Sequence, residues 1–185
     1  VGYIGKEQAA PILLEGLARL EYRGYDSAGI CVAENGVLDV AKCKGRLKNL
    51  AAMTENGALL HGTAGIGHTR WATHGEPNDI NSHPHVSQNG KVALVHNGII
   101  ENYLEIREFL EEKGVQFTSQ TDSEVVAQLL EYCLGLDEVH CMQDAIYMVL
   151  HRIEGAYAFG IVCADDPERI YAARKDAPLL LGYGD

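Results

Sequence analysis

Apolar residues recur along the chain with two different periods, and these predict alternating strands and helices. Residues 7–21 carry apolar side chains three and four positions apart, the spacing of one helical face. The stretches 1–5 and 30–33 on either side have strand composition. Asn35-Gly36 then predicts a two-residue hairpin turn, because this dipeptide adopts positive φ at both positions.

The second half of the chain shows the same two patterns. Residues 86–100 predict a hairpin that turns at Asn89-Gly90. Its returning strand, 92–95, is apolar on both faces and is expected to be buried on both, ending in His96-Asn97-Gly98. The other elements predicted are strands over 37–41, 156–164, 170–174 and 179–181, and helices over 47–53, 101–113, from the capping-box residues 121–124 onward, and over 137–153.

Hairpins and helices segregated in this way are typical of an α+β layered sandwich, in which helices pack outside antiparallel sheets. A length of 185 residues and an apolar content of 46% suit one domain with one core.

Charge and cysteine content narrow the classes of partner. The formal charge is -11, and the acidic residues are spread along the chain, which argues against a nucleic-acid surface and favours small molecules or protein as partners. The five cysteines show no paired spacing, so neither a disulfide framework nor a structural zinc site is indicated, and a reducing cytoplasm fits best. No apolar run is long enough for a membrane span, and no charged-then-apolar stretch occurs, so neither a membrane span nor a secretory signal is expected.

The stretch Gly67–Gly75 concentrates chemistry, because it places Arg70, Trp71, Thr73 and His74 between glycines. We interpret it as a strand that runs into a loop covering a substrate, with the Arg70 guanidinium suited to bind a carboxylate. The alternative is a polar hairpin with an arginine–tryptophan stack on the surface.

Two further positions could complete a site. Asn97 and Gly98 could together donate to a developing oxyanion, although Asn-Gly also suits a turn that ends a strand. Asp122 lies in the first turn of a helix, where the helix dipole stabilises a carboxylate, and this alone could explain it. Alternatively, its carboxylate could bind a ligand's ammonium group. With Arg70 binding a carboxylate, Arg70 and Asp122 would hold the two ends of an amino acid.

Other chemistries find less support. Residues 76–85 are expected to form an ordered functional loop, but its histidines lack a carboxylate at short helical spacing, so a metal site is disfavoured. No glycine-rich loop precedes a helix in the manner of nucleotide-binding proteins. The five cysteines are interpreted as packing residues, so no nucleophile is evident.

Five ordered motifs resemble the class II glutamine amidotransferase family. They are Val1–Gly5, Leu20–Gly29, Gly67–Gly75, His96–Asn102 and Thr121–Glu124. Within the family, Tyr22 and Tyr25 favour the branch that carries a sugar-isomerising domain over the purine-pathway branch. The resemblance implies an N-terminal-nucleophile hydrolase fold, a four-layer sandwich of two antiparallel sheets between helical layers.

The resemblance also implies a mechanism, in which an N-terminal cysteine thiolate attacks the side-chain amide of glutamine and its own α-amine acts as base. Ammonia then passes to a separate sugar-isomerising domain of the same full-length chain for amino-sugar synthesis. The resemblance assigns Asn97 and Gly98 to an oxyanion hole and Arg23 to the support of the amino-terminal group. It assigns Arg70 to the α-carboxylate and Asp122 to the α-ammonium of glutamine. Thr73 and His74 would line the glutamine pocket, and Trp71 would lie on the covering loop and help to route ammonia. No cofactor or metal is implied, nor a nucleic-acid or membrane partner; the full-length enzyme is expected to be a cytoplasmic homodimer.

By the same resemblance, residues 1–185 are expected to be one amidotransferase domain without its first residues, its C-terminal part or the isomerase domain. The nucleophile would lie three positions upstream of Val1. One alternative is a catalytically silent module that binds and senses glutamine. Another is a metal hydrolase built on the histidines.

Overall fold

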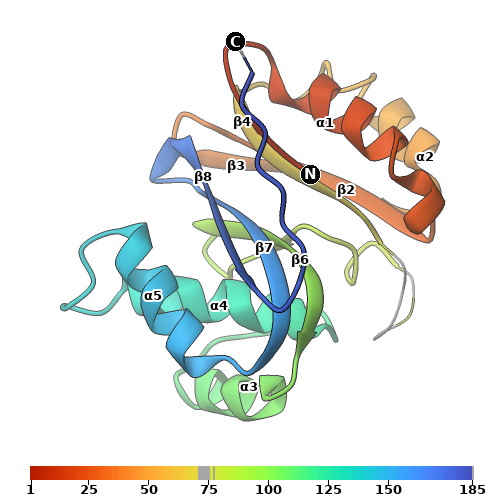
Figure 1. Cartoon of the computed structure of the whole chain (residues 1–185). Coiled ribbons are helices and arrows are strands. Elements are labelled where there is room, and N and C mark those ends of the chain that lie inside the picture. Colours follow the sequence, from red (N-terminus) through yellow and green to blue (C-terminus); the bar gives the residue numbers. More distant parts are fainter. Residues whose placement is uncertain (71–75, 77, 185) are drawn as a thin grey trace.

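Two four-stranded antiparallel sheets lie face to face between two layers of helices in the computed structural model, which describes residues 1–70, 76 and 78–184 (Figure 1). The first sheet has the order β1 (Gly2–Ile4), β4 (Ala64–Arg70), β2 (Ser27–Glu34) and β3 (Val37–Lys44). The second has the order β5 (His85–Val86), β6 (Val92–Ile100), β7 (Gly155–Cys163) and β8 (Asp166–Lys175). The predicted α+β sandwich is confirmed.

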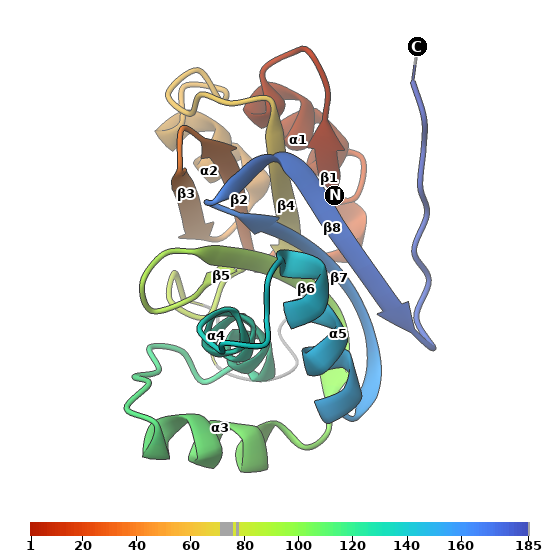
Figure 2. The same cartoon turned by 90° about the vertical axis from the view of Figure 1, so that its left-hand side faces the viewer.

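The helices cover the outer faces of the two sheets (Figure 2). The first sheet is covered by α1 (Ala9–Ala18) and α2 (Leu47–Met53). The second is covered by α4 (Asp122–Leu134), which α3 (Tyr103–Glu112) and α5 (Met142–Arg152) flank. No helix of the described residues combines the length and apolarity needed to cross a bilayer.

The core consists of three apolar layers, not the single one expected. Side chains alternate along each strand, so Ile30 and Val32 of β2 pack toward α1 while Cys31 and Ala33 face the second sheet. A thin layer between the sheets includes Ile66 and Val95. The third and largest layer lies between the second sheet and its helices. The central part of each sheet is thereby covered on both faces, whereas the edge strands β3 and β8 are partly exposed.

Locally encoded elements appear where the sequence predicts them. The helix over 47–53 has the predicted bounds. Asn35 and Gly36 have φ of 49° and 79°, and the residues from Val92 to Val95 are all buried.

Several predicted elements need correction. The strand expected at 30–33 begins already at Ser27, because residues 27–29 pair with both β3 and β4. The first helix ends at Ala18 and is followed by a 3-10 turn, η1 (Glu21–Arg23). The helix expected from 137 begins at Met142. Residues 179–181, all of them described, belong to neither sheet, and Leu180 is 95% exposed.

Strand β6 also corrects the expectation that a turn ends it at Gly98. Asn97 pairs with Ala158 and Gly98 with Tyr157, and pairing continues to Ile100. Gly98 has a φ of 133°, and a Cβ there would collide with the carbonyl oxygen of Ala156. Asn97-Gly98 is thus a feature within a strand, and the turn interpretation is wrong.

Candidate functional site

Strands β4 and β6 bring the two central motifs together where the sheets face each other. His68 and Arg70 lie two residues apart on β4, on the face that also carries Ile66 and therefore points to the second sheet. Asn97 lies two residues beyond Val95 on β6, on the face that points back. The His68 Nε2 atom is 2.8 Å from Asn97 Oδ1. Arg70, only 6% exposed, is therefore on the same side of its strand as the His68–Asn97 contact.

Asp122, the first residue of α4, lies near the same end of β6. Thr121 caps α4, since its Oγ1 accepts from the Glu124 N–H. The next residue, Asp122, accepts from the Ile100 N–H at 2.8 Å, and its side chain is 13% exposed. His96 Nδ1 lies 3.9 Å from the same carboxylate oxygen. This geometry holds the Asp122 carboxylate at the Asn97–Ile100 segment.

A loop over 78–85 packs against β2 and β3 of the first sheet. The Lys42 ammonium donates to the carbonyls of Ile80, Ser82 and Pro84 at 3.3, 3.0 and 3.3 Å. Gly29 lies beneath it, where a Cβ would collide with the His83 carbonyl. Of the ordered loop expected over 76–85, residues 78–85 are held by contacts with side chains distant in sequence, and Pro77 lies outside the described residues.

Three histidine rings contact one another in a row from the loop toward Asn97. The ring centroids of His68 and His83 are 4.4 Å apart with the rings tilted by 43°, and those of His83 and His85 are 4.7 Å apart in a T-shaped arrangement. His85 Nε2 lies 3.1 Å from Thr121 Oγ1, which connects the row to the start of α4. Burial lowers the pKa of His68 to about 4, and it lowers the pKa of His83 and His85 well below the ordinary value. The three rings are therefore neutral at pH 7.

The amino terminus and Arg23 reach this region from β1 and η1. The Val1 α-amine donates to the Gly67 carbonyl at 2.8 Å, and burial lowers the pKa of this amine. Arg23 is exposed, but the following Gly24 packs against the backbone of Thr69 and Arg70. Arg23 thus lies beside the end of β4.

Three of the sequence-predicted site residues, Trp71, Thr73 and His74, lie outside the described residues. The structure adds His68, Lys42 and Thr121, which sequence reasoning did not single out as site residues. For His68 a signal existed, because alternation along a strand puts it on the same face as Arg70. Lys42 and Thr121 join the region only through contacts with distant segments.

Four of the five cysteines do not supply an activated thiolate. All five are free. Burial raises the pKa of the Cys31 thiol far above its usual range, and burial also raises the pKa of Cys43, Cys133 and Cys163. These four thiols are therefore protonated, and so poorly nucleophilic, at neutral pH.

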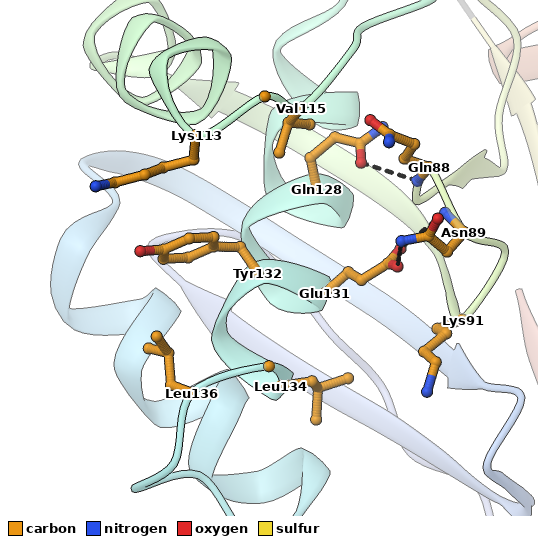
Figure 3. A pocket seen from close by; sticks show the side chains of 12 residues that line it. Gln88, Asn89, Lys91, Lys113, Val115, Gln128, Glu131, Tyr132, Leu134 and Leu136 are labelled. Atoms are coloured by element: carbon orange, nitrogen blue, oxygen red, sulfur yellow. Dashed lines mark hydrogen bonds between the residues drawn. The ribbon is translucent and has the colours of Figure 1, made fainter.

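A depression of about 450 Å³ lies against α4, away from the facing strands β4 and β6 (Figure 3). Its polar lining is used within the protein: Gln128 accepts from the Gln88 N–H at 2.9 Å, and Glu131 accepts from the Asn89 side chain at 2.6 Å. These bonds attach the β5–β6 turn to α4. None of the predicted site residues that the structure describes lines this depression.

Metal ligation finds no geometric support in the described part of the chain. There, no three side chains among His, Cys, Asp and Glu converge as a metal site would require. His68, His83 and His85 instead contact one another through their ring faces and edges.

Comparison with known proteins gives one consistent result. A family model described as a glutamine amidotransferase domain matches residues 68–183. Glutamine–fructose-6-phosphate aminotransferase (isomerizing) from Caldanaerobacter subterraneus subsp. tengcongensis is 60% identical over 185 residues, and that from Pyrococcus horikoshii is 50% identical over 184 residues. Each match covers 100% of this chain but 30% of the relative, so the chain spans less than a third of their length.

Solved structures agree. Glutamine phosphoribosylpyrophosphate amidotransferase from B. subtilis superposes with a TM-score of 0.74 at 32% identity, covering 88% of this chain and 34% of that one. A class II glutamine aminotransferase domain protein from Silicibacter pomeroyi, at 16% identity and a TM-score of 0.54, covers 84% of this chain and 71% of that one and shares the fold alone. A domain model that matches more than half of the chain, together with the fold of two facing sheets between helices, places this chain in the class II glutamine amidotransferase family.

Proposed function

We propose that this chain is the glutaminase part of a glutamine–fructose-6-phosphate aminotransferase. It would hydrolyse glutamine to glutamate and supply ammonia for making glucosamine 6-phosphate from fructose 6-phosphate. The single observation that carries the proposal is the meeting of Arg70 and Asn97-Gly98 on facing strands, with Asp122 at the same end of β6. The names of relatives 50–60% identical over the whole chain support this assignment.

In the proposal, Arg70 and Asp122 hold the backbone groups of glutamine. The Arg70 guanidinium receives the α-carboxylate through two parallel hydrogen bonds. Asp122 receives the α-ammonium, and the Ile100 N–H fixes the carboxylate that does so. Thr73 and His74 line the pocket for the side chain, and Trp71 covers it and helps to route ammonia.

The nucleophile in the proposal is a cysteine three positions ahead of Val1. Gly2 pairs with Ile66 and Tyr3 with Gly65, so an extended β1 would place that cysteine opposite Arg70. Directly paired residues of an antiparallel sheet point to the same face, and the Arg70 face is the one that faces Asn97. This register supports the assignment, and Arg23 beside the same strand end would support the amino-terminal group.

The proposed reaction proceeds through a thioester. The cysteine α-amine takes the thiol proton, and the thiolate forms a C–S bond to the amide carbon while the carbonyl oxygen becomes an oxyanion. The Asn97 side-chain N–H and the Gly98 backbone N–H stabilise that charge. The α-ammonium returns the proton to the nitrogen, the C–N bond breaks, and ammonia leaves. Water then hydrolyses the thioester to glutamate and the free thiol.

The remaining parts of the proposal concern the whole enzyme. Ammonia would pass to a sugar-isomerising domain in the part of the relatives that this chain does not cover. The full-length enzyme would be a homodimer in the cytoplasm, and residues 1–185 would be a portion of its amidotransferase domain.

The test is ammonia release by the native polypeptide with its amino-terminal cysteine in place. Asn97→Ala should lower kcat by about 100- to 1000-fold with little change in KM, because the lost bond forms only in the transition state. Asn49→Ala on the exposed side of α2 is the matched control. A raised KM with unchanged kcat would make Asn97 a ground-state contact. Glutamine binding without ammonia release would instead support a sensing module.

A further inference from the structure

The His68–Asn97 contact joins the two sheets at the site, and the atoms in contact show which residue is the hydrogen-bond donor. Asn97 presents its carboxamide oxygen to His68 Nε2 at 2.8 Å. A carbonyl oxygen only accepts, so His68 must donate from Nε2. The NH₂ group of the same amide then points away from His68.

The environment of the His68 ring favours the tautomer that this bond needs. Within the described residues, its Nδ1 atom is buried and has no hydrogen-bond partner. A proton on Nδ1 would be an orphaned buried donor, which proteins tolerate less well than an orphaned acceptor. The groups that bear on the ring are Arg70, the Val1 amine, His96 and His83. Burial, with the Arg70 guanidinium and the Val1 amine nearby, lowers the His68 pKa to about 4, so the ring carries a single proton.

The orientation of Asn97 decides whether its side chain helps or opposes the proposed reaction. An exposed carboxamide can rotate by half a turn, presenting either NH₂ or oxygen to a ligand. Only the NH₂ group can stabilise an oxyanion, since an oxygen in that place would repel it. Asn97 is exposed, and among the described residues its bond to His68 distinguishes the two orientations.

We infer that His68 is a positioning residue that donates from Nε2 to Asn97 Oδ1 and thereby turns the Asn97 NH₂ toward the developing oxyanion. The inference rests on the proposed function. It gives His68 of β4 a role in the reaction, which His68 performs only through Asn97 of β6. His83 packs against the His68 ring, and His85, which contacts Thr121, packs edge-on against His83, so these contacts hold the His68 ring in place.

The test uses two polar substitutions that differ by one methylene. In His68→Gln the terminal NH₂ reaches about as far as Nε2, whereas in His68→Asn the amide reaches only about as far as Nδ1. In the native polypeptide, His68→Asn should lower kcat by about tenfold or more with KM changed less than about threefold. His68→Gln should retain kcat within about threefold, and thermal melting checks that both variants fold.

A double substitution separates this inference from the proposed function. If His68 acts only through Asn97, His68→Asn should cost less than about twofold when Asn97 is already Ala. An equal loss in both backgrounds, or equal kcat for His68→Asn and His68→Gln, would overturn the positioning role and leave the oxyanion role of Asn97 intact. An Asn97→Ala variant with unchanged kcat would overturn both.

Discussion

Asn97 and Gly98 are neighbours on β6 but serve the site for different physical reasons. Asn97 contributes a side chain that His68 orients across the gap between the sheets. Gly98 contributes a backbone that no other residue could adopt easily, with a φ of 133° and no room for a Cβ beside Ala156. The pair combines an oriented side chain with a specialised main chain in two residues.

Gly98→Ala should destabilise the fold and abolish most glutaminase activity. The methyl group would have to displace the β7 backbone, and positive φ adds about 1–2 kcal/mol of strain. We expect a loss of about 3 kcal/mol or more in unfolding free energy, measured by urea denaturation. Gly90→Ala is the matched control, because Gly90 also has a positive φ, 72°, but nothing within 4 Å. Equal losses of unfolding free energy for the two variants would show that the positive φ, and not the collision with β7, causes the destabilisation.

Arg70→Lys should weaken glutamine binding at least about tenfold. An ammonium replaces a planar fork and loses one charge-assisted hydrogen bond, worth about 1.5–3 kcal/mol. Calorimetry on the native polypeptide with its nucleophile replaced by alanine measures the affinity without turnover. Arg169→Lys, on the exposed edge of β8, should leave it unchanged. Unchanged affinity in Arg70→Lys would remove Arg70 from the proposed site.

At the scale of elements, the start of α4 organises several segments. The Thr121–Glu124 motif predicts a reciprocal capping box, but only one half forms, since Thr121 accepts from the Glu124 N–H. The buried Glu124 carboxylate instead accepts from the N–H groups of Thr118 and Ser119 at 2.9 and 2.5 Å. Glu124 thus shapes the loop before the helix that presents Asp122.

Glu124→Gln should cost about 1.5–3 kcal/mol of unfolding free energy, because an amide has one acceptor oxygen where two N–H groups need one each. Urea denaturation gives the value. Glu108→Gln on the exposed face of α3 is the control and should change stability by less than about 0.5 kcal/mol. A loss below that limit for Glu124→Gln would mean that the loop finds other acceptors.

At the scale of the whole molecule, the side chains between the two sheets are apolar at one end and polar at the other. Cys31, Ala33 and Ala93 lie in the apolar part. His68, His83 and His85 lie in the polar part, under the Lys42-anchored loop. The site therefore forms where the apolar layer between the sheets ends.

These buried histidines should make the fold sensitive to acid. Their folded pKa values lie below the ordinary 6.5, with His68 at about 4. Below pH 6.5 the unfolded chain binds protons that the fold does not, so stability falls as pH decreases toward 4. Each such histidine contributes about 1.4 kcal/mol per pH unit across that window.

Urea denaturation of this chain at several pH values between 7.5 and 4.5 measures the dependence. His83→Phe should make it shallower by about one histidine's contribution. The same substitution at the exposed His61 should leave it unchanged. A pH-independent unfolding free energy in this range would show that the histidines are protonated within the fold.

The sequence by itself determined the elements whose causes are local. The bounds of α2, the Asn35-Gly36 turn and the capped start of α4 follow from backbone preferences and apolar spacing within a few residues. The motif order also identified the family and the residues expected to carry its chemistry.

Only the tertiary structure decided how those residues meet. The extension of β6 through Asn97-Gly98, the His68–Asn97 contact and the Lys42 anchor all depend on partners 29 or more positions away in sequence. Local preference favoured a turn at Asn97-Gly98, but pairing with β7 continues through that segment to Ile100 and keeps it extended. Such pairings are set by the packing of two sheets against each other, and no periodicity within one segment encodes them.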